Sequence, residues 1–135
     1  MKVVLDTNVL VSGIFYSGPP SAILRAWKQG KFRLILTPPI LEEYKDVAAR
    51  LGERFPGIDI ARIIELVIVE SELCRPVALA QPVCADPKDD KFIATAISGK
   101  ANVIVSGDKH LLNVSGYHGI LVVTPRVFIE RIMRS

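Results

Sequence analysis

The chain has 135 residues, of which 50% are hydrophobic and 23% are charged, and its formal net charge is +3. This length suits a single domain, and the composition excludes an intrinsically disordered chain. No apolar stretch approaches the roughly 20 residues that cross a bilayer, so we expect a soluble, cytoplasmic protein without membrane contact. Cys74 and Cys84 lack the spacing of zinc ligands, and we expect them to be buried or incidental.

Four short apolar runs, mostly β-branched, predict buried strands. They span residues 3–5, 34–36, 103–105 and 120–123. Because these runs do not alternate with polar residues, they are typical of strands covered on both faces, as in a parallel sheet.

Helical patterns separate the predicted strands. They cover residues 21–29, 38–51 and about 59–70, a segment that opens at Asp86-Pro87, and a segment after Thr124-Pro125. Thr37 and Asp59 are placed to cap the second and third helices, whereas residues 73–85 give no clear prediction. The alternation predicts one α/β domain over residues 1–135 with a mostly parallel central sheet.

Two of the predicted strands run directly into acidic residues. The first leads into Asp6 and the third leads, through Ser106-Gly107, into Asp108. In open α/β sheets the active crevice lies beyond the carboxyl ends of the strands, so these two acids share one crevice if their strands are neighbours. The alternative is that both are ordinary turn residues, which Asp often is.

The helix over residues 38–51 supplies a third candidate. Its apolar stripe centres close to Tyr44, which places Glu43 on the shoulder of the stripe and Glu42 on the solvated side. Glu43 is therefore the glutamate able to reach a partly buried site. The alternative is a solvated glutamate that interacts favourably with the helix dipole.

The segment Asp86-Pro87-Lys88-Asp89-Asp90-Lys91-Phe92 supplies a fourth. On a helical wheel Asp89 falls near the centre of the apolar stripe, Asp90 lies about 90° away, and Lys91 points to solvent. An acid on the apolar face is unusual. The alternative is a capping arrangement in which Asp86 caps the helix and Asp89 reaches back, and the two roles are compatible.

Four clustered carboxylates would repel one another and take up protons unless a cation accompanied them. The cation that suits oxygen ligands is Mg²⁺ or Mn²⁺, which can activate water for attack on a phosphoryl group. If four of the 14 acids belong to one site, 17 basic residues dominate the rest of the chain, which suits a phosphate backbone. Candidate RNA-contacting residues are Arg25, Lys28, Lys31, Arg33, Lys109 and Arg126; for each of them taken singly, ordinary solvated surface is the favoured alternative.

These stretches resemble the PIN-domain ribonucleases, most closely the branch that contains VapC-type toxins of toxin–antitoxin systems. The resemblance covers residues 2 to about 134 and rests on the order and spacing of the segments 3–10, 37–44, 86–92 and 103–108. It implies a three-layer α/β/α fold and Mg²⁺- or Mn²⁺-dependent hydrolysis of RNA phosphodiester bonds. It also implies a homodimer and an antitoxin protein whose peptide blocks the active-site groove.

The resemblance also implies roles for individual residues. The catalytic acids match Asp6, Glu43, Asp89 and Asp108, of which Asp6, Asp89 and Asp108 would hold the metal. Supporting positions match Asn8 and Ser106. Because the two acids Asp89 and Asp90 are adjacent, the match is uncertain by one position there, and Asp90 is taken as a supporting acid beside Asp89.

Two other classes of function remain open on the sequence. One is a non-catalytic, RNA-binding or scaffolding PIN-like domain, against which the complete set of acids argues. The other is a phosphatase or phospho-acceptor domain, for which an Asp-x-Asp motif after the first strand is expected, but here Asn8 follows Asp6-Thr7. Dinucleotide-binding and P-loop functions are excluded because their glycine motifs are missing.

Overall fold

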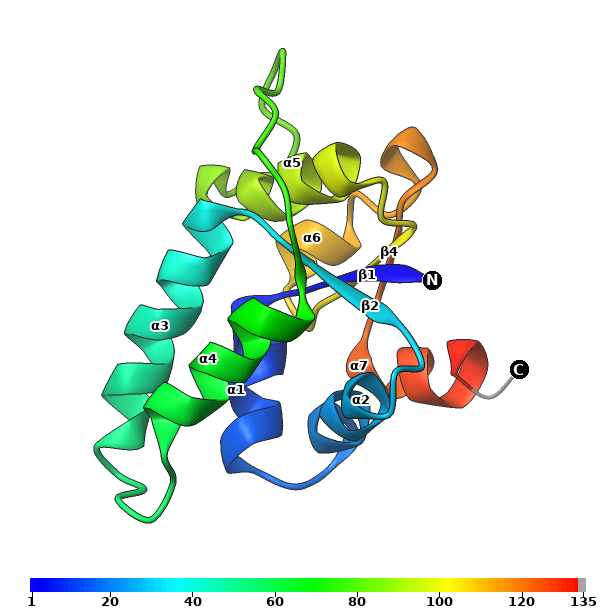
Figure 1. Ribbon diagram of the computed structural model, residues 1–135. Coiled ribbons are helices and arrows are strands. Elements are labelled where there is room, and N and C mark those ends of the chain that lie inside the picture. Colours follow the sequence, from blue (N-terminus) through cyan, green and yellow to red (C-terminus); the bar gives the residue numbers. More distant parts are fainter. Residues whose placement is uncertain (134–135) are drawn as a thin grey trace.

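The computed structural model describes residues 1–133, so the last two residues of the predicted domain lie outside the described part of the chain. Its centre is a parallel sheet of five strands in the order β3-β2-β1-β4-β5 (Figure 1). The strands are β1 (Lys2–Leu5), β2 (Arg33–Leu36), β3 (Glu72–Leu73), β4 (Val103–Val105) and β5 (Leu121–Val123). The predicted parallel sheet is confirmed.

The central strands are buried on both faces, as their unbroken apolar runs predict. Val3, Val4 and Leu5 of β1 are inaccessible to solvent, and β4 is buried along its length. β1 and β4 are neighbours, with Leu5 paired to Val105. The segments that follow these two strands therefore leave the sheet side by side, at its carboxyl edge.

Helices cover both faces of the sheet. They are α1 (Thr7–Phe15), α2 (Pro19–Lys28), α3 (Pro38–Gly52), α4 (Ile60–Glu70), α5 (Asp90–Gly99), α6 (Lys109–Leu112) and α7 (Pro125–Val127). Two 3₁₀ turns span Pro87–Asp89 and Tyr117–Gly119, and a π-helical turn, Phe128–Ile132, follows α7. Figure 1 shows α5 on one face of the sheet and α1, α2 and α7 on the other. This is the expected three-layer α/β/α architecture. None of the helices in the described part combines the length and apolar character that a membrane crossing requires.

α1 and α2 pack at close range because of one glycine. A Cβ atom at Gly13 would lie 2.7 Å from both Leu24 Cδ1 and the carbonyl oxygen of Pro20. Phe15 at the end of α1 belongs to the core, and its ring centroid lies 5.0 Å from that of Phe55.

Three elements differ from the sequence prediction. α1 was not predicted because it is apolar on most sides and has no polar face to reveal a helical period, and α6 and β3 are too short to show a period. Asp59 caps α4 by accepting a hydrogen bond from the backbone of Arg62, as predicted. Thr37 precedes α3, but its hydroxyl bonds to that of Thr95 at 2.7 Å instead of capping the helix.

Candidate active site

The carboxylate of Asp6 lies at the carboxyl end of β1 and is almost fully buried, with 6% of the residue exposed. Its backbone N–H donates to Val105, which ties the start of α1 to the end of β4. The Ser106 hydroxyl donates to Asp6 Oδ2 at 2.6 Å. Burial raises the pKa of Asp6; the bond from Ser106 opposes this shift, and the negative charges of Asp108 and Glu43 add to it.

Ser106 links this first acid to the last one. Its Oγ also accepts a hydrogen bond from the backbone N–H of Asp108 at 2.9 Å. Asp108 in turn accepts a bond of 2.7 Å from the backbone of His110 and thereby caps α6. A single hydroxyl therefore organises both strand ends, because β1 and β4 are adjacent.

Asp89 reaches the same region from the 3₁₀ turn before α5. The residue is 9% exposed, and its Oδ2 atom is buried without a hydrogen-bond partner in the described part of the chain. Burial, followed by the charges of Asp108, Asp86 and Asp6, raises the pKa of Asp89 to about 6. Three acids from separate segments therefore influence one another's charge at the carboxyl edge of the sheet.

Glu43 lies beside these acids but has its own counter-ion. Its Oε2 is 3.0 Å from Lys91 Nζ. The neighbouring Tyr44 is fully buried, and its hydroxyl donates to the carbonyl of Leu5, which anchors α3 to the end of β1. The prediction that Lys91 points to solvent is wrong, because α3 packs against α5 and brings Glu43 within reach of the lysine side chain.

The structure separates the two adjacent acids of the 86–92 segment. Asp90 turns away from Asp6 and accepts hydrogen bonds from the backbone N–H groups of Val83 and Cys84, at 3.3 and 2.7 Å. It thus secures the loop before α5, whereas Asp89 faces the other acids, as the helical wheel indicates. The Asn8 side chain is exposed, and only its backbone favours the charged form of Asp6.

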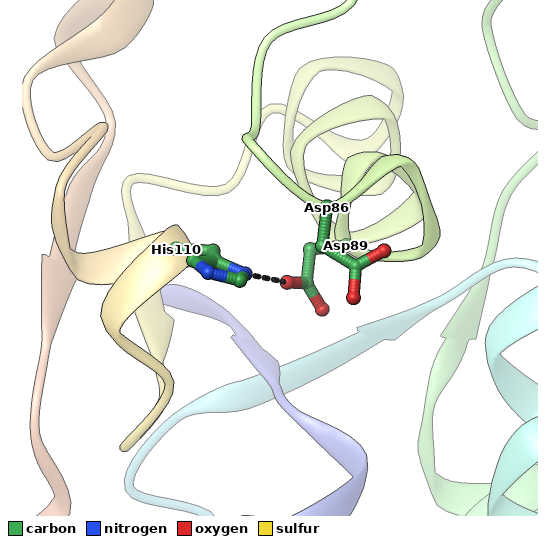
Figure 2. A group of neighbouring side chains, drawn as sticks. All are labelled: Asp86, Asp89 and His110. Carbon is green, nitrogen blue, oxygen red and sulfur yellow. Dashed lines mark ion pairs between the residues drawn. The ribbon is translucent and has the colours of Figure 1, made fainter.

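His110 belongs to this region, although the sequence did not single it out. Its Nδ1 lies 3.7 Å from Asp89 Oδ2 and 3.8 Å from Asp108 Oδ1. Figure 2 shows the imidazole of α6 facing the Asp89 carboxylate, with Asp86 beside it. The available signal was the position of His110 two residues after Asp108, which places it in the helical turn that this acid caps.

The predicted basic residues do not all lie near the acids. Lys109 begins α6, directly after Asp108. Lys28 and Lys31 line a hollow with Met1 and Lys2, at the amino edge of the sheet and thus opposite the acids. The Arg25 guanidinium, on α2, donates to Ser21. Contact of these residues with RNA stays a prediction.

Comparison with known proteins identifies the family. The family model described as PIN domain matches residues 2–110. The chain belongs to the PIN domain family. It is also 32% identical to the uncharacterized protein MJ1680 of Methanocaldococcus jannaschii over 146 aligned positions, which cover 96% of this chain and 90% of the relative. Neither match distinguishes a toxin branch within the PIN family.

PIN domains are generally metal-dependent nucleases, and the residues present here fit a divalent cation. The donors are carboxylate oxygens, which hard divalent cations prefer. One of these oxygens, Oδ2 of Asp89, is buried without a hydrogen-bond partner among residues 1–133, and the pKa values of Asp6 and Asp89 are raised. Both features describe negative charge that lacks compensation, which a bound cation would supply.

Proposed function

We propose that this chain is a divalent-metal-dependent endoribonuclease that hydrolyses RNA phosphodiester bonds, and that it is the toxin component of a toxin–antitoxin pair. The observation that carries the proposal is the convergence of Asp6, Asp89 and Asp108 at one edge of the sheet, with a buried carboxylate oxygen among them that has no hydrogen-bond partner in the described residues. A domain that only binds RNA gains nothing from acids facing phosphates, because like charges repel.

In this proposal Asp6, Asp89 and Asp108 hold Mg²⁺ or Mn²⁺. When bound, the cation would lower the pKa of a water molecule and stabilise charge on the phosphoryl group under attack. Ser106 keeps the carboxylate of Asp6 oriented through its 2.6 Å hydrogen bond.

Glu43 is proposed to orient the attacking water or to take its proton. Two contacts fix its position: the ion pair with Lys91 and the anchoring of the adjacent Tyr44 to β1. Asn8 and Asp90 are proposed as supporting residues, of which Asp90 acts through the loop that it holds.

RNA is the proposed substrate because basic residues dominate the chain outside the acidic site. Lys109, next to Asp108, is the proposed contact for phosphates at the scissile position. Arg25, Lys28 and Lys31 are proposed contacts for more distant parts of the strand.

A homodimer and an antitoxin protein are the proposed protein partners. Leu66 and Val69, one turn apart on α4, expose apolar surface, which supports a protein–protein contact there. The exposed patch lies on a helix that does not supply any of the proposed catalytic acids.

The test is cleavage of a labelled pool of single-stranded RNA with Mn²⁺, Mg²⁺ or EDTA. We expect the wild type to cleave only with metal, Asp6→Asn to fold but not cleave, and Glu42→Gln to cleave normally. Glu42 is the matched control because it is an exposed acid on α3, next to Glu43. Undiminished cleavage by Asp6→Asn would refute the assignment. RNA binding without cleavage by the folded wild type would support a non-catalytic domain instead.

A further inference from the structure

We infer that Asp86, Asp89 and His110 form a mixed oxygen–nitrogen ligand set that binds a first-row transition-metal ion such as Mn²⁺ in preference to Mg²⁺. The inference rests on the proposed function in one respect, because Asp89 is also one of the proposed nuclease acids. Neither Asp86 nor His110 has a role in the proposed catalytic site.

The three side chains offer one ligand atom each, and these atoms all lie within 4.8 Å of one another. Metal–ligand bonds of about 2.0–2.2 Å place the ligands of one ion roughly 3–4 Å apart. A small closing movement of the side chains would therefore bring all three onto a single ion. Figure 2 shows them converging from the turn before α5 and from α6.

The backbone around these residues is held by local hydrogen bonds. Asp86 accepts a bond from the Lys88 N–H through Oδ1, and the Asp89 N–H donates to the Asp86 carbonyl. His110 is fixed by the bond from its N–H to Asp108. These bonds hold the backbone that carries the three ligands before any ion binds, while the second oxygen of Asp86 makes no hydrogen bond in the described residues.

The second line of evidence is the unpartnered oxygen. Asp89 is 9% exposed, and its buried Oδ2 faces the imidazole at 3.7 Å, which is too long for a hydrogen bond. Burying a carboxylate oxygen without a hydrogen-bond partner costs folding free energy, and a cation bound to this oxygen would offset that cost. His110 itself is about half exposed, with 47% of its side chain accessible, which leaves a route for an ion from solvent.

The nitrogen ligand decides which ion is preferred. Mg²⁺ binds oxygen ligands and retains most of its water, whereas imidazole favours first-row transition metals. Two carboxylates with one imidazole are therefore a set in which Mn²⁺, Co²⁺ or Zn²⁺ gains over Mg²⁺. If His110 were not a ligand, the preference of the site for Mn²⁺ over Mg²⁺ would not depend on its imidazole.

The test measures metal binding directly, without RNA. Mn²⁺ affinity is determined by electron paramagnetic resonance of the free ion, with Mg²⁺ as competitor, and nitrogen ligation is detected as ¹⁴N modulation of the bound Mn²⁺ signal. The variants are His110→Asn, which replaces the imidazole with an amide, and His118→Asn as matched control. His118 lies near Lys100 and Asn102, which precede β4, and thus away from the acids; its φ of 51° is one that Asn tolerates.

We expect the wild type and His118→Asn to prefer Mn²⁺ and to show the ¹⁴N modulation. His110→Asn should lose the modulation, and its Mn²⁺ affinity should fall at least about tenfold, the effect that loss of even a supporting contact at a metal site produces. Its Mg²⁺ affinity should change little. Circular dichroism in EDTA verifies that each variant folds.

Equal Mn²⁺ affinity in the wild type and His110→Asn, or no ¹⁴N modulation in the wild type, would overturn the inference. RNA cleavage is measured on the same samples, which separates this inference from the proposed function. Cleavage without nitrogen ligation refutes the inference alone, and nitrogen ligation without cleavage refutes the proposed ribonuclease while supporting the metal site.

Discussion

Asp89→Asn is expected to stabilise the metal-free protein while it removes a proposed metal ligand. In the folded chain, burial and the neighbouring acids raise the pKa of Asp89 from 3.8 to about 6. Above pH 6 the folded state therefore holds this carboxylate less favourably than the unfolded state does. That destabilisation is complete above the folded pKa and disappears as the pH falls toward 3.8.

The size of the pKa shift of Asp89 determines how much stability Asp89→Asn should gain. At about 1.4 kcal/mol per pKa unit, the ionised carboxyl costs about 3 kcal/mol near pH 7.5 and about half of that at pH 5. Asn has nearly the same shape but brings an NH₂ group that needs its own partners, so we expect a net gain of about 1–3 kcal/mol. A gain of about 2 kcal/mol raises the Tm of a domain of this size by roughly 6–10 °C.

The assay is urea denaturation in EDTA at both pH values, with Asp46→Asn as control. Asp46 is an exposed acid on α3, and its variant should differ from the wild type by less than about 0.5 kcal/mol. Adding Mn²⁺ should then stabilise the wild type more than Asp89→Asn, because only the wild type retains all of the proposed metal ligands. An Asp89→Asn protein less stable than the wild type in EDTA near pH 7.5, or a stability difference that does not narrow at pH 5, would show that the ionised Asp89 carboxylate does not destabilise the metal-free fold.

Three further substitutions test contacts that support the site and the packing of the helices. Ser106→Ala removes the hydroxyl that bonds to Asp6, and it should cost about 1–3 kcal/mol in urea denaturation and lower cleavage; unchanged activity would show that this hydroxyl does not orient the acid. Tyr44→Phe leaves the Leu5 carbonyl without its donor and should cost about 1–2 kcal/mol by the same measurement, whereas no loss would mean that this bond does not anchor α3. Gly13→Ala places a methyl group 2.7 Å from α2 atoms and should lower stability by about 1–3 kcal/mol; a Tm equal to that of the wild type would mean that the helices separate freely.

Much of the fold follows from local sequence patterns. The strands are short, β-branched and free of polar residues because both faces of the sheet are covered, and that pattern is readable. α3 shows a clear helical period and is preceded by Thr37, so it was predicted nearly to its ends. α1 was missed because a helix that is apolar on most sides, with buried Val9, Leu10 and Val11, has no polar face to reveal its period.

The acids of the site were predictable only in part. Strand ends and helical wheels single out Asp6, Asp89 and Asp108, and the structure brings these three acids together at the carboxyl edge of the sheet. The pairing of Lys91 with Glu43 depends on how α3 packs against α5, which no local pattern contains. His110 is placed by the short α6, and the distance of Lys28 from the acids depends on the direction of α2; both are set by tertiary structure.

Whether the carboxylates around Asp6 form a metal-dependent nuclease site is tested most directly by RNA cleavage. The wild type and Asp6→Asn are compared in parallel on single-stranded RNA, with metal and with EDTA. We predict cleavage by the wild type alone, abolished by EDTA and restored when Mn²⁺ is added in excess. Cleavage that persists in EDTA, or in a folded Asp6→Asn protein, would contradict the claim that these carboxylates form a metal-dependent nuclease site.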